Sequence, residues 1–240
     1  MHANSRKMMQ MKYPDNGLDH YHAFIFDFDG TLVPCLDLRA MKQRVLDFTI
    51  ERTGIARHEI QNMMMVEFID HTHRWLIETG QQGTDYFEQA HNLVREIEIE
   101  AATATSLFPG TAELLSTLKA CDKQIGIVTR NCEQALRLMC PNIDDFCDAL
   151  VARDHAQYLK PDPRHLQQCL SALDTSFTDS LMIGDGVVDI QIAQAMKVDC
   201  VGVLGGHNSE AELAAASPTW LIKHVNDLKI YLGGHATAGF

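Results

Sequence analysis

Apolar residues follow a helical spacing in one long stretch of this chain, between about residues 37 and 104. Apolar positions there step by three and four, a spacing typical of amphipathic helices. The clearest run is Phe87, Ala90, Val94, Ile97 and Ala101. Glycine in this stretch is confined to Gly54, Gly80 and Gly83. The pattern predicts three or four helices that turn near Gly54 and Gly80.

On both sides of this stretch, short apolar runs alternate with helix-like segments. Strands are predicted at residues 23–26, 125–129, 149–152, 181–183, 200–203 and 220–222. Helices are predicted at residues 111–120, 133–139, 164–173, 187–196 and 209–216, with a helical turn at 225–230. Strands that alternate with helices of this length predict βαβ units. The predicted fold class is α/β, a Rossmann-like parallel sheet core with an inserted α-helical cap domain.

The predicted domain boundaries follow from the helical stretch that interrupts the alternating strands and helices. The α/β core is expected to comprise residues 21–36 and 105–232, and the helical cap residues 37–104. Residues 1–20 are polar and predict a disordered leader, and residues 233–240 predict a flexible tail. Ligands bind outside the carboxyl ends of the strands in open α/β sheets. Because the insertion leaves from such an end, we expect it to lie over the site.

Charge and composition narrow the functional classes. The net charge is −12 with histidine neutral, which argues against nucleic-acid binding because that needs a basic patch. No apolar run approaches the ~20 residues of a membrane helix. The seven cysteines are odd in number and form no C-x-x-C pair, so reduced thiols are expected. We therefore expect a cytoplasmic monomer or homodimer that binds neither nucleic acid nor membranes.

Four short polar segments follow predicted strands. They are residues 27–31 (Asp-Phe-Asp-Gly-Thr), 129–131 (Thr-Arg-Asn), 160–163 (Lys-Pro-Asp-Pro) and 184–189 (Gly-Asp-Gly-Val-Val-Asp). Several carboxylates at one sheet edge repel, and a pair ~4 Å apart costs about 4 kcal/mol at an effective dielectric constant of ~20. A hard divalent cation relieves that repulsion. Mg²⁺ fits best, because it takes few carboxylates and shares its coordination with a phosphate.

Together these segments resemble the motifs of the haloacid dehalogenase superfamily, in its phosphatase branch, over about residues 22–230. The insert is similar in position to the helical cap of the phosphoglycolate phosphatase and β-phosphoglucomutase subgroup. The resemblance implies that Asp27 is the nucleophile that accepts the phosphoryl group. It implies that Asp29 protonates the leaving oxygen and then activates water. It also implies that Mg²⁺ is held by Asp27, the backbone carbonyl of Asp29 and Asp185, with Asp189 in support.

Further residues are assigned to the substrate through the same resemblance. Thr129 and Lys160 are expected to hold the phosphoryl oxygens, with Gly30 in the tight turn around the phosphate. Arg130 and Asn131 are additional candidates for phosphate binding, although a structural role fits them equally well.

The insert contributes two candidates for substrate specificity. The run Gly54-Ile55-Ala56-Arg57-His58 resembles a cap loop that reaches into the site in related enzymes. Arg57 and His58 are therefore candidate specificity residues, and a solvated helix N-terminus is the alternative reading. In the core, Pro34-Cys35 replaces the Asp-Ser common after the first motif, so that loop gives no guide to the substrate.

The expected activity is Mg²⁺-dependent hydrolysis of a small-molecule phosphate ester, a monoester, through an aspartyl-phosphate. A phosphomutase needs the same four motifs and stays open as an alternative. The superfamily's haloacid dehalogenases lack a second aspartate two residues after the nucleophile, so Asp29 argues against that activity. Loss of Asp27, Asp29 or Lys160 would have favoured a non-catalytic binding module. Phosphoglycolate, sugar phosphates and nucleotides all remain open as substrates.

Overall fold

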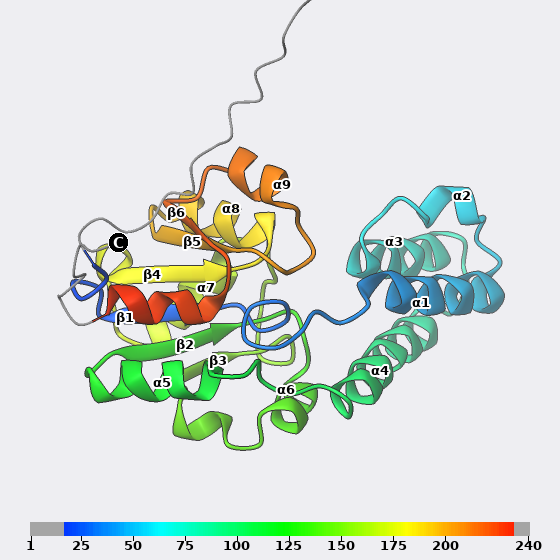
Figure 1. Cartoon of the computed structure of the whole chain (residues 1–240). Helices are drawn as coiled ribbons and strands as arrows, with labels where there is room; N and C mark the ends of the chain where they lie inside the picture. Colours follow the sequence, from blue (N-terminus) through cyan, green and yellow to red (C-terminus); the bar gives the residue numbers. More distant parts are fainter. Residues whose placement is uncertain (1–16, 233–240) are drawn as a thin grey trace, which may run out of the picture. The chain divides into compact units, whose positions relative to one another are not determined.

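The computed structural model describes residues 17–232, which form two compact units (Figure 1). The core domain combines the described residues up to Cys35 with those from Thr105 onward, and the helical domain is Leu36–Ala104. The predicted tail and most of the predicted leader lie outside the described residues. Within that leader Leu18 is buried, and its backbone N–H donates to the carbonyl of Tyr231 at 2.9 Å. The core therefore includes Leu18, before the boundary predicted at residue 21.

The core domain is built on a parallel sheet, which confirms the predicted α/β class (Figure 1). Its six strands have the order β3-β2-β1-β4-β5-β6. They are β1 (Ala23–Phe26), β2 (Gln124–Val128), β3 (Ala149–Val151), β4 (Ser180–Gly184), β5 (Asp199–Val203) and β6 (Trp220–Ile222). In the centre, Ala23 of β1 pairs with Gln124 on one side and with Ser180 on the other. Every residue of β1 and β4 is buried, because helices cover both faces of a parallel sheet.

Helices and 3₁₀ turns follow the strands in the core domain. They are α5 (Thr111–Ala120), α6 (Glu133–Met139), η1 (Ile143–Asp145), α7 (Arg164–Ala172), η2 (Phe177–Asp179), α8 (Val187–Ala195), α9 (Glu210–Ala215) and η3 (Val225–Tyr231). Residues of α7, α8 and α9 share a hydrophobic cluster with Ala23 and Ile25 of β1. Phe24 and Phe26 alternate with these residues and point to the other face. The final turn, expected to be helical, is a 3₁₀ helix, and the sequence pattern gave no sign of η1 or η2.

The helical domain consists of α1 (Leu38–Thr53), α2 (Arg57–Ile60), α3 (Met65–Glu78) and α4 (Gly83–Ala102). Asp37 caps α1 by accepting the backbone N–H of Ala40 at 2.9 Å. The chain leaves α1 through Gly54 at φ 73° and leaves α3 through Gly80 at φ 75°, conformations that glycine adopts without strain. These glycines mark the two predicted turns. Side chains of α1, α3 and α4 form a hydrophobic core of their own.

None of the helices within residues 17–232 combines the length and the apolar character that crossing a membrane requires.

Candidate active site

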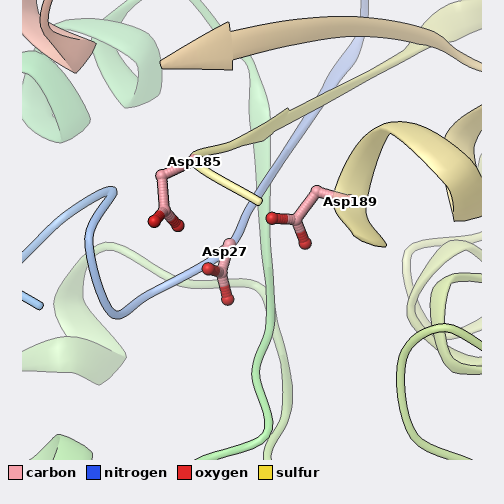
Figure 2. Close-up of side chains that lie close together, drawn as sticks. All are labelled: Asp27, Asp185 and Asp189. Atoms are coloured by element: carbon pink, nitrogen blue, oxygen red, sulfur yellow. The ribbon is translucent and has the colours of Figure 1, made fainter. Parts of the chain in front are cut away.

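Three aspartates converge at the carboxyl ends of β1 and β4 (Figure 2). Asp27 follows β1 directly, Asp185 follows β4, and Asp189 lies in the first turn of α8. Their carboxylates point toward one another (Figure 2), and one oxygen of each lies within 4.8 Å of the others. All three side chains are buried. The sheet topology thus brings the first and fourth motifs together.

Lys160 places its ammonium group among these carboxylates. Its Nζ lies 2.6 Å from Oδ1 of Asp27 and 2.7 Å from Oδ1 of Asp189. Lys160 is only 4% exposed. Burial acts to lower the pKa of Lys160, but the charges of Asp189 and Asp27 outweigh it and raise that pKa above its ordinary value. The ammonium of Lys160 therefore supplies positive charge to this site near neutral pH.

One ammonium does not neutralise three buried carboxylates. Burial, together with the charges of Asp27 and Asp189, raises the pKa of Asp185 to about 8. Burial also raises the pKa of Asp189 to about 6, although Lys160 acts to lower it. Near neutral pH the cluster must therefore hold a proton or a cation. Buried carboxylate oxygens that still need positive charge fit a hard divalent cation.

The surroundings of Asp185 have little room for side chains. A Cβ on Gly206 would overlap Oδ2 of Asp185, and a Cβ on Gly30 would lie 2.5 Å from the same oxygen. The backbone N–H of His207 donates to that oxygen at 3.0 Å. The N–H of Gly30 donates to the carbonyl of Val33 at 2.8 Å. Gly30, a predicted phosphate-binding residue, thus uses its own N–H to close the loop.

Thr31 and Cys35 also face Asp185, and no role was predicted for either of them. The hydroxyl of Thr31 donates to Oδ1 of Asp185 at 3.5 Å, and Sγ of Cys35 lies 3.8 Å from Oδ2. Burial, with the charge of Asp185 next in effect, raises the pKa of Cys35 to about 12. The Cys35 side chain is therefore a neutral thiol and is unsuited to act as a nucleophile.

The carboxylate of Asp29 is engaged with the second motif. Nδ2 of Asn131 lies 3.1 Å from Oδ1 and 3.2 Å from Oδ2 of Asp29, and the hydroxyl of Thr129 donates to Oδ2 at 3.4 Å. Thr129 and Asn131 are buried, whereas Asp29 and Arg130 are half-buried. The carbonyl of Arg130 accepts from Nη1 of Arg153 at 3.1 Å. The first and second motifs therefore meet through Asp29.

The sequence profile of the haloacid dehalogenase-like hydrolases matches residues 24–203, which include all four motifs. The chain belongs to this family. The family resemblance expected from the motifs is thereby confirmed, and so is the expected class of enzyme, a hydrolase.

Individual relatives of this hydrolase agree with the assignment. This chain is 25% identical over 175 residues to a haloacid dehalogenase-like hydrolase domain-containing protein of Arabidopsis thaliana. The match covers 72% of this chain and 66% of that one. It is 28% identical over 221 residues to a phosphoglycolate phosphatase of Pseudomonas putida, covering 88% of this chain and 79% of the relative. A crystal structure of a hydrolase from Pseudomonas syringae has the same fold. It has a TM-score of 0.67 and 23% identity, and the match covers 88% of this chain and 97% of that one.

The backbone of Lys160 in this hydrolase contacts His165, a residue for which the sequence pattern predicted no role. The backbone N–H of Lys160 donates to Nδ1 of His165 at 3.2 Å. Because Nδ1 must accept, the ring proton is on Nε2, which lies 3.2 Å from the carbonyl of Val151. Burial, and then the charge of Lys160, lowers the pKa of His165 to about 4. A neutral His165 thus ties the chain at Lys160 to the end of β3.

The two predicted specificity residues belong to the helical domain of the hydrolase. Arg57 and His58 open α2 and are exposed. The guanidinium of Arg57 forms an ion pair with the carboxylate of Asp47 in α1. The cluster described above consists of core-domain residues, so Arg57 and His58 are not part of it.

Proposed function

We propose that this hydrolase is a magnesium-dependent phosphatase that hydrolyses a small-molecule phosphate monoester through a phosphorylated Asp27. The observation that carries the proposal is the ion pair between Asp27 and the buried Lys160, inside a cluster of three aspartates. Similarity to a phosphoglycolate phosphatase over 88% of the chain supports the same reaction class. All seven cysteines are free thiols, which fits the reducing cytoplasm as the proposed compartment.

In the first half-reaction, a carboxylate oxygen of Asp27 attacks the phosphorus atom of the bound ester. The bond between phosphorus and the ester oxygen breaks, and the carboxyl group of Asp29 gives its proton to that oxygen. The alcohol leaves, and the phosphoryl group is now bonded to Asp27. Thr129 and the ammonium of Lys160 would hold the phosphoryl oxygens during this transfer.

In the second half-reaction, a water molecule attacks the phosphorus atom of the phosphorylated Asp27. Asp29, now ionised, takes a proton from that water. The bond between phosphorus and the Asp27 oxygen breaks, and inorganic phosphate leaves. Asp27 returns to the carboxylate form and Asp29 to the acid form, so both are ready for another turnover.

Several oxygen atoms of the chain could serve Mg²⁺, some as direct ligands and others in a supporting position. Asp27, Asp185 and the backbone carbonyl of Asp29 would hold the ion. Both oxygens of Asp189 already accept hydrogen bonds, from Lys160 at 2.7 Å and from the N–H of Gly186 at 3.0 Å, so Asp189 would support the site from behind. When bound, Mg²⁺ neutralises charge on the phosphoryl oxygens and takes the place of the proton that the buried cluster otherwise needs.

The test compares Asp27→Asn with Asp29→Asn, using nitrophenyl phosphate as the substrate. Asp27→Asn should reduce phosphate release to background, because no nucleophile is present. Asp29→Asn should still be phosphorylated, because nitrophenolate leaves without a proton, and phospho-enzyme should accumulate because the second half-reaction lacks its base. Mass spectrometry of acid-quenched protein should detect one added phosphoryl group in Asp29→Asn and none in Asp27→Asn.

A control variant and a metal titration complete this test. Asp144→Asn removes an exposed aspartate that pairs with Arg137 and should keep full activity. Mg²⁺ should support turnover of the wild-type protein and excess chelator should abolish it, whereas Ca²⁺ should inhibit because its coordination is larger and looser. Activity of Asp27→Asn without any phosphorylated form of the wild type would instead indicate direct attack by water.

A further inference from the structure

Asn131 has all four of its hydrogen-bonding groups engaged. Its backbone N–H donates to the hydroxyl of Thr129 at 3.0 Å, and its carbonyl accepts the N–H of Arg153 at 3.0 Å. In the side chain, Oδ1 accepts the backbone N–H of Cys132 at 2.8 Å, and Nδ2 faces both oxygens of Asp29. Three of these contacts fix the residue itself. The fourth is directed at the proposed proton donor.

The orientation of the Asn131 amide follows from its neighbour. A backbone N–H can only donate, so the atom that faces the N–H of Cys132 must be the amide oxygen. The amide nitrogen therefore faces Asp29, at 3.1 Å and 3.2 Å from the two carboxylate oxygens. Asn131 is only 4% exposed, whereas Asp29 is half-buried, so the amide is shielded from water on the Asn131 side of this contact.

We infer that Asn131 is a positioning residue that holds the Asp29 carboxyl group for proton transfer, and that it does not bind the phosphoryl oxygens. This role rests on the proposed function and goes beyond it. An N–H donor stabilises an ionised carboxylate, and the ionised carboxylate of Asp29 is what remains after the proton reaches the leaving oxygen. In the second half-reaction that carboxylate loses its charge as it takes a proton from water, so the contact gives no help there. Asn131 therefore assists the first half-reaction most.

The test measures kcat/KM for substituted phenyl phosphates that differ in how readily the phenol leaves. Asn131→Ala removes the contact, and Asn131→Asp keeps an oxygen for the N–H of Cys132 while placing a negative charge against Asp29. Both should lower kcat/KM for unsubstituted phenyl phosphate about tenfold or more, as expected for a lost hydrogen bond to a charged group. Both should lower kcat/KM for nitrophenyl phosphate far less, because nitrophenolate needs no proton.

The same substitutions in an Asp29→Asn background give the second readout. The Asn131 substitutions should cause no further loss of kcat/KM in that background, because the carboxyl group that Asn131 positions is already gone. Equal losses across the phenyl phosphates, or a full additional loss in the Asp29→Asn background, would overturn the positioning role. Failure of the proposed function is separate and is detected in the wild type, as absence of phosphorylated Asp27 after reaction with nitrophenyl phosphate.

Discussion

Replacing Lys160 by methionine tests whether the buried ammonium is needed to hold the three aspartates together. Methionine preserves much of the length and apolar stem of the lysine side chain but removes its charge. In the wild type, Nζ lies 2.6 Å from Asp27 and 2.7 Å from Asp189. Lys160→Met therefore leaves buried carboxylates with no ammonium between them.

The expected magnitude follows from opposing terms. At an effective dielectric constant of about 20, each contact at these distances is worth roughly 6 kcal/mol. Burying the ammonium costs several kcal/mol, and protonation of a carboxylate relieves part of the repulsion that the variant suffers. Breaking a buried ion pair by removing one partner typically costs ~3–5 kcal/mol. We expect Lys160→Met to lose this much free energy of unfolding at pH 8.

The free energy of unfolding that Lys160→Met loses should become smaller as the pH falls. Lys160 acts to lower the pKa of Asp189, which burial raises to about 6, so the substitution raises that pKa further. A carboxyl group whose pKa is higher in the folded state binds extra protons on folding, and it loses its stabilising effect as the pH rises through that value. The variant should therefore be closest to the wild type near pH 5 and furthest from it at pH 8.

Urea unfolding in the presence of chelator, at several pH values, measures both effects. Lys119→Met is the matched control, because Nζ of Lys119 also lies 2.6 Å from a carboxylate, that of Asp148, but both side chains are about one third exposed. Surface pairs of this kind contribute ~0–1 kcal/mol. If Lys160→Met cost no more than Lys119→Met at pH 8, the ammonium would not be what stabilises the cluster.

Four further substitutions test other parts of the structure. In saturating Mg²⁺, the wild type should lose stability between pH 6.5 and pH 4 because the pKa of His165 is lowered. His165→Leu should abolish this part of the loss. If urea unfolding gave the variant the same change in unfolding free energy as the wild type across this range, the prediction would be contradicted. Gly206→Ala should raise the Mg²⁺ concentration needed for half-maximal activity at least tenfold, because its Cβ would displace the Asp185 carboxylate, and an unchanged Mg²⁺ titration would refute this. Arg57→Ala and His58→Ala should lower kcat/KM for the natural substrate more than for nitrophenyl phosphate, since remote contacts act through positioning. Equal losses on both substrates would assign these two residues a structural role.

The sequence allowed much of the fold to be predicted because its signals are local. The turns at Gly54 and Gly80 follow from glycines at the ends of helical patterns, and both residues have a positive φ. The strand before Asp27 follows from four apolar residues in a row, all of them buried. The meeting of Asp27 with Asp185 followed from one rule, that the carboxyl ends of parallel strands share an edge.

The contacts that the sequence could not predict depend on packing between distant segments. His165 lies behind Lys160 because α7 packs near the end of β3, and nothing in the helical pattern around His165 indicates this. Gly206 lies against Asp185 because the loop after β5 crosses beside the loop after β4. The side chain of Asn131 faces Asp29 because Cys132 orients its amide. No motif spacing encodes such an orientation.

The central position of β1 in the sheet affects how this protein folds while it is synthesised at the ribosome. Among the described strands, β1, which ends just before Asp27, is the first to be synthesised, yet its partners begin at Gln124 and Ser180. The helical domain, continuous from Leu36 to Ala104 with a hydrophobic core of its own, is completed before either partner exists. An apolar strand must therefore wait unpaired while the chain grows, and contacts so distant in sequence form slowly. Every nascent copy thus passes through a stage in which its central strand is open to aggregation or to a chaperone.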